Sequence, residues 1–228
     1  MIDVFLVHLD RIRDTLALLP LLDDAERRRA SRFHFAADSR RFIVSHAALR
    51  LILAEYAAVA GPQLIFETNR HGKPALLQDD KLFFNLSHSG ELALCCVTGV
   101  GEVGIDIECR RKVDGEALAQ RFFSDEENAA LARLPADRRE QWFFSCWTRK
   151  EAYIKAKGLG LSIPLDQFSV QCAPDKAAAL ISSPYAPEDV PRFSMWDLPV
   201  PDGYQAALAL CGAWGGVPAV REWDFGGR

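Results

Sequence analysis

The order of apolar and polar positions predicts a strand and a long helix in the N-terminal half of the chain. A strand-like run covers residues 2–9, and an amphipathic helical pattern covers residues 39–61. Asp38 or Ser39 is the expected cap of that helix, and a Gly-Pro pair is expected to stop it. Short apolar runs between turn residues then predict four strands, over residues 64–67, 82–86, 91–97 and 103–107.

The C-terminal half follows the same order. Ser124 and Glu127 fit a capping box ahead of an apolar helical run, and a second helix is predicted over residues 138–157, with Gly158 at its end. Further strands are predicted over residues 168–172, 192–196 and 204–210. We therefore expect an α+β fold of two similar halves, residues 1–105 and 106–228, related by a pseudo-twofold duplication.

Composition and charge exclude some functional classes. The chain has 228 residues, 49% hydrophobic and 25% charged, which is ordinary for a globular protein. A net charge of -4 argues against nucleic-acid binding through overall basicity, so any basic site must be local. No apolar run reaches the roughly 18 to 20 residues of a membrane span, and Asp3 and Asp10 interrupt the first run too early for a signal peptide. We expect a cytoplasmic monomer with no nucleic-acid or membrane partner.

The cysteines give no sign of a metal or disulfide framework. They have no C-x-x-C spacing and two are adjacent, so neither a zinc site nor a set of disulfides is predicted. We interpret all six as small core residues: Cys95, Cys96, Cys109, Cys146, Cys172 and Cys211.

The segment "VGIDIECRR" raises an electrostatic problem. Alternation along a strand puts Ile105 and Ile107 on one face and Asp106 and Glu108 on the other. Neighbouring carboxylates repel each other, and partial burial is costly unless a positive group meets them. The sequence therefore requires a cation near this strand.

The glycines just before that strand, in "GVGEVG" at residues 99–104, match the dinucleotide-binding pattern G-x-G-x-x-G. That pattern needs a helix after it, whereas a strand is predicted here. The favoured interpretation is a hairpin turn that pairs residues 91–97 with residues 103–107.

Several segments offer partners for such a site, each with an ordinary structural alternative. "FFNLSHSG" places Ser87 and His88 at the end of an apolar strand, where they suit a turn, and no G-x-S-x-G of a serine hydrolase is present. "RHGKPAL" holds Lys73 between turn residues, and "ERRRASRF" is a basic cluster that could be a solvated helix face. In "WTRKEAYIKAKG", Glu151 and Lys155 share a helix face and could form a plain ion pair.

Taken together, these segments favour a magnesium ion that carries a pyrophosphate. Mg²⁺ in proteins binds through a few carboxylates, waters and substrate phosphates. Asp106, Glu108 and Glu151 could supply oxygen ligands. The cations expected around a polyphosphate are Lys73, His88, Lys150, Lys155 and an arginine of the basic cluster.

The blocks "FNLSHSG", "GIDIE", "FFSDEE" and "WTRKEAYIKAKGLGLSIPLDQFSV" resemble the signature of the 4′-phosphopantetheinyl transferases of the surfactin-synthetase-activating type, over about residues 18–170. The resemblance implies two fused α+β units with coenzyme A in the cleft between them. It also implies a reaction in which Mg²⁺ assists transfer of the phosphopantetheine arm to a serine of an apo acyl or peptidyl carrier protein, with release of 3′,5′-ADP.

The resemblance also implies roles for individual residues. Asp106, Glu108 and Glu151 match the metal-site acids, and Lys155 matches a phosphate-binding lysine. Gly72, Lys73 and Pro74 match the adenine-side loop, and Ser87 and His88 match positions near the coenzyme A phosphates. Where the family often has lysines for the 3′-phosphate, this chain has Arg27, Arg28 and Arg29, of which we favour Arg29.

In the chemistry this implies, Glu151 is the candidate base and Lys155 stabilises the leaving group. Arg121, Phe122 and Phe123 are candidates for carrier docking, with a helix entry and core aromatics as the alternative. A magnesium-dependent phosphoesterase or nucleotidyl transferase, and a noncatalytic coenzyme A or carrier-binding module, remain alternative functions.

Overall fold

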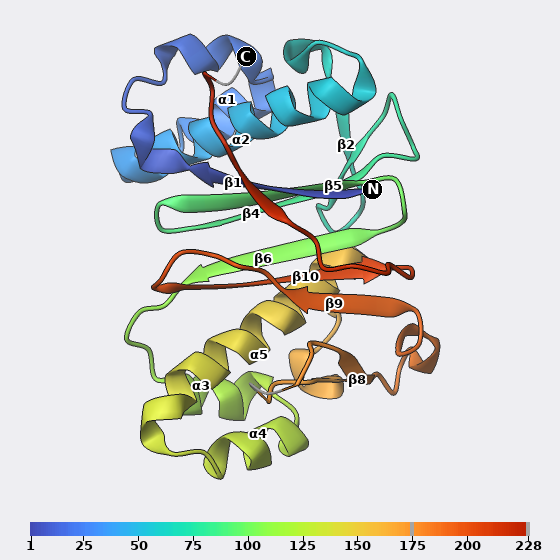
Figure 1. The fold of residues 1–228 in the computed structure, drawn as a ribbon. Coiled ribbons are helices and arrows are strands. Elements are labelled where there is room, and N and C mark those ends of the chain that lie inside the picture. Colours follow the sequence, from blue (N-terminus) through green and yellow to red (C-terminus); the bar gives the residue numbers. More distant parts are fainter. Residues whose placement is uncertain (174–175, 227–228) are drawn as a thin grey trace.

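A computed structural model describes residues 1–173 and 176–226. It has four layers, in which two sheets face each other in the middle and helices cover the outer face of each sheet (Figure 1). The expected α+β class is therefore confirmed. The elements of the N-terminal part are β1 (Ile2–His8), α1 (Asp24–Ala30), α2 (Ala36–Ala57), β2 (Phe66–Thr68), β3 (Pro74–Leu76), β4 (Phe83–Ser89) and β5 (Leu92–Thr98). Those that follow are β6 (Val103–Cys109), α3 (Gly115–Phe122), α4 (Asp125–Ala132), α5 (Ala136–Lys157), β7 (Ser169–Val170), β8 (Leu180–Ser182), β9 (Phe193–Asp197), β10 (Tyr204–Cys211) and β11 (Val220–Trp223).

The two central sheets share one topology. In the first, β5 lies between β1 and β4, and in the second, β10 lies between β6 and β9. Each long helix, α2 or α5, follows the first strand of its sheet, and each is followed by a short two-stranded sheet, β2–β3 or β7–β8. This matching order supports the expected relation between the halves, although the duplication itself stays a prediction.

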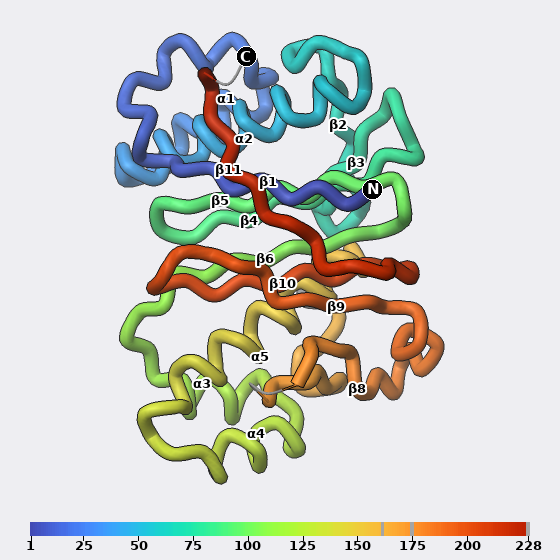
Figure 2. Tube along the Cα trace, viewed as in Figure 1, coloured from blue at the N-terminus to red at the C-terminus, as the bar shows by residue number. Residues whose placement is uncertain are grey.

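Strand β11 departs from a simple division into two halves. It pairs in parallel with β1, so the chain returns from the second sheet to the edge of the first (Figure 2). Strand β6 also runs across the expected boundary between residues 105 and 106, because it pairs along its length with β10. The division at that boundary stays a prediction.

The helix ends follow local chemistry in most places. The capping box of Ser124 and Glu127 is present at the start of α4, and Gly158 ends α5 in a left-handed conformation, both as predicted. The prediction for α2 is wrong at both ends. The helix begins before Ser39, whose hydroxyl instead donates to the Ala30 carbonyl, and it ends at Ala58 with a φ of 52°.

The predicted hairpin between β5 and β6 is wrong, since these strands belong to different sheets. The glycines before β6 serve a different purpose. A Cβ on Gly104 would lie 2.1 Å from the Ala152 carbonyl oxygen and 2.3 Å from the Ala156 nitrogen. Gly104 therefore lets the backbone of α5 lie directly against β6, which brings the two acids of β6 close to the helix.

Polar side chains of β4 join the first sheet to the second. The two strands are edge strands of their own sheets, and β6 would otherwise leave backbone N–H groups unpaired. Three side chains of β4, here called the β4 ladder, accept from every second N–H of β6. The distances from the backbone nitrogen to the side-chain oxygen are 2.9 Å for Ile105 to Asn85 Oδ1, 3.4 Å for Ile107 to Ser87 Oγ and 3.1 Å for Cys109 to Ser89 Oγ.

The two faces of β6 separate as the alternation predicts. Ile105 and Ile107 are buried in an apolar core shared by the facing sheets, with Val4, Leu94 and other side chains of the first sheet. Asp106 lies on the opposite face, toward α5. Helix α5 packs over a separate aromatic core that contains α3, α4 and β9.

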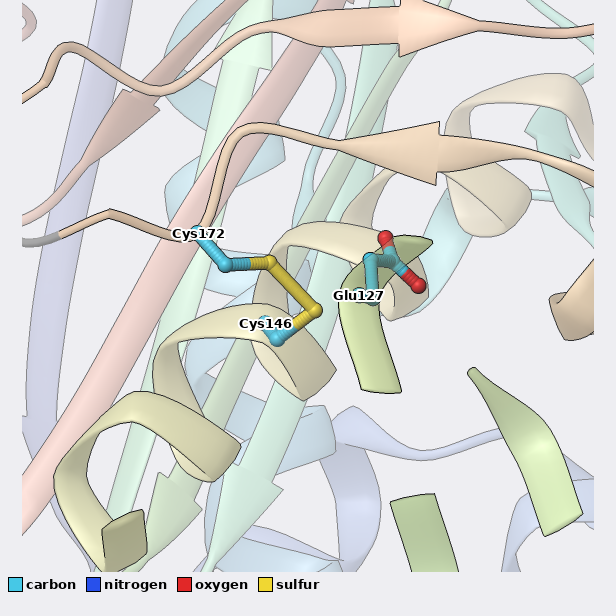
Figure 3. Close-up of side chains that lie close together, drawn as sticks. All are labelled: Glu127, Cys146 and Cys172. Carbon is cyan, nitrogen blue, oxygen red and sulfur yellow. A yellow bond between two sulfur atoms is a disulfide. The ribbon is translucent and has the colours of Figure 1, made fainter. Parts of the chain in front are cut away.

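The prediction for the cysteines is wrong for one pair. Cys146 in α5 and Cys172 after β7 form a disulfide, with the Glu127 side chain beside it (Figure 3). A spacing of 26 residues gives no hint of this contact, which depends on how β7 packs against α5. Cys95 and Cys96 are buried and free, as expected for core residues.

Among the helices that the structure describes, none is long and apolar enough to cross a membrane.

Gly104→Ala should destabilise the protein strongly, because the added methyl group would collide with the backbone of α5 and not with a movable side chain. We expect a loss of about 2 kcal/mol or more in the free energy of unfolding, measured by urea denaturation. Gly99→Ala is the matched control, since its new Cβ would lie 3.8 Å from its nearest neighbour. Equal stability of the two variants would show that α5 can move away from β6 without cost.

Candidate active site

A buried ion pair lies where β4, β6 and α5 meet. Lys155 Nζ donates to Asp106 Oδ1 at 2.6 Å and to Ser87 Oγ at 3.0 Å, and the Ser87 hydroxyl donates to the same Asp106 oxygen at 3.0 Å. The Asp106 side chain is only 5% exposed, whereas that of Lys155 is 28% exposed. The lysine thus reaches from a buried acid toward solvent.

One oxygen of Asp106 has no partner among the residues that the structure describes. Asp106 Oδ2 is buried and makes no hydrogen bond in the described part of the chain. Burial raises the pKa of Asp106, while the charge and hydrogen bond of Lys155 oppose that shift. Because an unpaired buried carboxylate oxygen is costly, this atom is a natural ligand for a cation.

Two further acids share the negative field of Asp106. Glu108 accepts a 2.8 Å hydrogen bond from Ser89, and burial and then the charge of Asp106 raise its pKa. Burial and the charge of Asp106 raise the pKa of Glu151 to about 7, against the opposing effect of Lys155. Within the described residues, the Glu151 carboxylate makes no hydrogen bond. The three acids therefore carry more negative charge than Lys155 balances.

This donor set fits a divalent cation held in an open site. Oxygens of Asp106, Glu108 and Glu151 do not all lie within 4.8 Å of one another, so the described chain contains no closed three-acid cage there. Mg²⁺ is commonly bound through one or two carboxylates and completed by waters and substrate phosphates. The unpartnered oxygen of Asp106 makes that residue the main candidate ligand.

The one three-residue group that does converge in the described chain is unsuited to a metal. It consists of Glu127, Cys146 and Cys172. The two sulfurs are joined in the disulfide (Figure 3). Glu127 forms an ion pair with Lys150.

Two adjoining cavities lie beside the acids. One, of about 360 Å³, is lined by Glu151, Lys155 and the turn between β2 and β3. The other, of about 530 Å³, extends toward α1 and α2 and is lined by Arg29 and His88. They share four lining residues, so an elongated ligand could extend through both: Gly72, Pro74, Asn85 and Leu86.

The larger cavity has a cationic end. The Arg29 guanidinium is exposed and lies 5.2 Å from the centroid of the Phe42 ring. His88 reaches solvent, but partial burial, followed by the charges of His46, Lys155 and Arg29, lowers its pKa. Arg27 is turned away, since it donates to two carbonyls and pairs with Asp24. Of the three arginines considered, Arg29 is the one that lines the cavity.

The prediction that Lys150 contacts a bound phosphate is wrong. Its side chain is fully buried, and its amine lies 2.7 Å from Glu127 and donates to the carbonyls of Leu165 and Phe168 at 2.6 Å each. One residue along a helix turns the side chain by about 100°, so Lys150 points into the aromatic core while Glu151 points into the cavity. Phe123, a candidate for docking, is likewise a buried core residue.

The amine of Lys73 is occupied within the protein. It donates to Glu102 Oε2, to the Val103 carbonyl and to the Ala156 carbonyl. Gly72 and Pro74, its neighbours, do line both cavities. Sequence reasoning missed two asparagines: Asn69, which accepts from the Lys73 N–H in the turn, and Asn85, which accepts from the Ile105 N–H. The period-two pattern of Asn85, Ser87 and Ser89 along a strand was the available signal for the β4 ladder.

Buried acids, a lysine among them and two adjoining cavities, one of them lined by Arg29, suit an enzyme that acts on a phosphate-containing ligand. Comparison with known proteins identifies the family. The model of the 4′-phosphopantetheinyl transferase superfamily matches residues 102–209, and that of the 4′-phosphopantetheinyl transferase N-terminal domain matches residues 12–98.

Named relatives are similar in sequence to most of the chain. The 4′-phosphopantetheinyl transferase HetI of Nostoc sp. is 38% identical over 86% of this chain and 81% of its own length. The enzyme psf-1 of Bacillus pumilus is 38% identical over 78% of each chain, and Sfp of Bacillus subtilis is 31% identical over 69% of each chain. The chain therefore belongs to the 4′-phosphopantetheinyl transferases, an enzyme family, as its signature blocks predicted.

Proposed function

We propose that this protein transfers the 4′-phosphopantetheine arm of coenzyme A to a serine of an apo acyl or peptidyl carrier protein, depends on Mg²⁺ and releases 3′,5′-ADP. The observation that carries the proposal is the Asp106–Lys155 pair, with its unpartnered carboxylate oxygen, beside the cavity that Glu151 and Lys155 line. The transfer activity also agrees with the names of the relatives.

The two cavities suggest how coenzyme A binds. Its 3′-phosphate would meet Arg29 and His88, at the cationic end of the larger cavity. Its diphosphate would lie near Lys155, whose ammonium has three donors, of which Asp106 and Ser87 take two. The third donor remains for a phosphate oxygen. The turn with Gly72 and Pro74 would border the molecule between these two positions.

The reaction needs alignment and charge neutralisation more than covalent help from the protein. The serine oxygen forms a bond to the β-phosphorus while the bond from that phosphorus to the 3′,5′-ADP oxygen breaks. Mg²⁺, held by Asp106 and Glu108, would supply neutralisation of the diphosphate charge. Lys155 donates to the leaving phosphate and stabilises the negative charge that develops there.

Glu151 accepts the serine proton, directly or through a water. A base works best when its pKa lies near the working pH, and burial among the other acids raises the pKa of Glu151 to about 7. Its carboxylate makes no hydrogen bond within the described chain, so it is available to the substrate. Lys155, one helical turn away, then stabilises the leaving group while Glu151 removes the proton.

The central test uses mass spectrometry of an apo carrier protein incubated with this protein, coenzyme A and Mg²⁺. We expect the carrier to gain one phosphopantetheine group, and Asp106→Ala to abolish the gain. The variant should stay folded, because it removes a buried charge and leaves Lys155 partly exposed to water. Thermal unfolding checks that point.

Asp202→Ala, at an exposed loop position, is the control and should retain full transfer. Full activity of Asp106→Ala at ordinary Mg²⁺ concentrations would overturn the metal assignment. Hydrolysis of simple phosphodiesters without a carrier would instead indicate a phosphoesterase or nucleotidyl transferase. Binding of coenzyme A with no transfer would indicate a noncatalytic module.

Glu151→Gln separates a base from a metal ligand, because the amide keeps one ligand oxygen and loses the basicity. We expect kcat to fall by about 10² to 10⁴, with little change in coenzyme A binding and no rescue by excess Mg²⁺. In the wild type, kcat should fall as the pH drops through the pKa of Glu151, since protonation removes the base, and this acidic limb should vanish in the variant.

The control for Glu151→Gln is Glu140→Gln, an exposed position on the same helix. Recovery of wild-type kcat at high Mg²⁺ would leave Glu151 as a metal ligand only.

Arg29→Ala and His88→Ala should each raise KM for coenzyme A by about 10-fold or more and leave KM for dephospho-coenzyme A nearly unchanged, because only the 3′-phosphate loses a charge-assisted hydrogen bond. The His88 effect should grow as the pH falls, since its pKa is lowered and the ring gains its charge only at lower pH. Arg28→Ala, on the same helix but outside the cavity lining, is the control. Equal losses for both substrates would assign these residues to structural support.

A further inference from the structure

The turn between β2 and β3 contacts the C-terminal end of α5. The Asn69 side-chain amide donates to the Gly158 carbonyl at 2.7 Å, and Lys73 Nζ donates to the Ala156 carbonyl at 2.8 Å. The last four carbonyls of a helix have no partner within it, and a cation near that end is favourable. A turn from the first half of the chain thus caps the helix that carries Glu151 and Lys155.

Lys73 has no hydrogen left for a ligand. An ammonium group has three N–H donors, and Lys73 directs them at three protein acceptors. These are Glu102 Oε2 at 2.5 Å, the Val103 carbonyl at 3.1 Å and the Ala156 carbonyl. The side chain is only 13% exposed, so its amine connects the start of β6 with the end of α5 beneath the surface.

The turn itself is held in one shape. Asn69 Oδ1 accepts from the backbone N–H groups of His71 and Lys73, and Gly72 has a φ of 87° that only glycine adopts readily. On the helix side, a Cβ on Gly158 would lie 2.8 Å from the Lys73 side chain. The shape of the turn and the glycine at the end of α5 therefore both allow this close contact.

The position of this contact links two parts of the site. Gly72 in the turn and Pro74 at the start of β3 line both cavities. Lys73 borders the smaller cavity from the same side, and Glu151 and Lys155 line it from the helix. Any movement of the helix end away from the turn would separate Gly72, which borders the cavities, from Glu151 and Lys155. Small misplacements of this kind are enough to slow catalysis by large factors.

We infer that Lys73 is a positioning residue that, together with Asn69, fixes the catalytic end of α5 to the turn bordering both cavities, and that its amine is not a phosphate ligand. The inference rests on the proposed function for its kinetic consequence. The contact itself requires no substrate, so it can be tested in the protein without ligand.

The test compares Lys73→Met, Asn69→Ala and a control, Lys81→Met, at an exposed lysine. Hydrogen exchange of the backbone amides of Lys155 to Gly158 is measured first, in the ligand-free protein. We expect both turn variants to exchange about tenfold faster there and the control to match the wild type. Asn69 carries no charge, so the same change in both variants cannot come from a lost phosphate contact.

Coenzyme A and dephospho-coenzyme A binding and steady-state transfer are measured on the same variants. We expect kcat to fall by about tenfold or more, with a smaller change in KM and an unchanged ratio of the two affinities. Unchanged exchange in both turn variants would overturn the inference, as would a selective loss of coenzyme A binding in Lys73→Met with Asn69→Ala like the wild type. If the wild type transfers nothing, the proposed function fails, while the exchange data still decide the role of the contact.

Should Lys73→Met fail to fold, Asn69→Ala and Lys73→Arg decide the outcome. The arginine keeps the charge and can still donate to carbonyls, so slower exchange than in Asn69→Ala is expected. Wild-type exchange in Asn69→Ala would then overturn the inference.

Discussion

The β4 ladder is the contact on which the site depends. Two edge strands from different sheets lie side by side, and side chains of β4 take the place of the partner backbone that β6 lacks on that side. A hydrogen bond of this kind contributes only about 0.5 to 1.5 kcal/mol net, but an unsatisfied buried N–H costs more. The β4 ladder therefore adds little net stability, but any other register would leave buried N–H groups of β6 unsatisfied. Its main effect is to fix the register between the two sheets.

That register brings the chemical groups together. Ser87 belongs to the ladder through its contact with Ile107, and the same hydroxyl contacts Asp106 and Lys155. A shift of one residue between β4 and β6 would turn the Ser87 hydroxyl away from Asp106 and Lys155 and would leave the N–H groups of β6 without their acceptors. Gly104 completes the arrangement by allowing α5 to approach β6 closely enough for that lysine to reach.

Features that depend on short-range sequence patterns were predicted correctly. Predictions failed for contacts between segments that are distant in the sequence. The faces of β6, the capping box of α4 and the end of α5 follow from alternation and helix-cap chemistry, and they are as expected. The hairpin prediction failed because side chains of β4, and not the backbone of β5, hydrogen-bond to the edge of β6. The glycines before β6 carry no information about that long-range contact. The prediction for Lys150 failed because the sequence does not show which of two neighbouring helix residues faces the cavity. A rotation of about 100° per residue directs the Lys150 side chain toward Glu127 instead.

Strand β11 makes the order of synthesis matter for this fold. Until residues 220–223 leave the ribosome, β1 has an unpaired edge, and more than a hundred residues of the second sheet and its helices are made in the meantime. At about 5 to 20 residues per second, that edge stays open for roughly ten seconds. A nascent chain with an exposed, apolar edge strand is a target for chaperones and for pairing with other chains. The parallel addition of β11 to β1, with Arg221 paired to Asp3, then covers that edge of β1 after the second sheet has been synthesised.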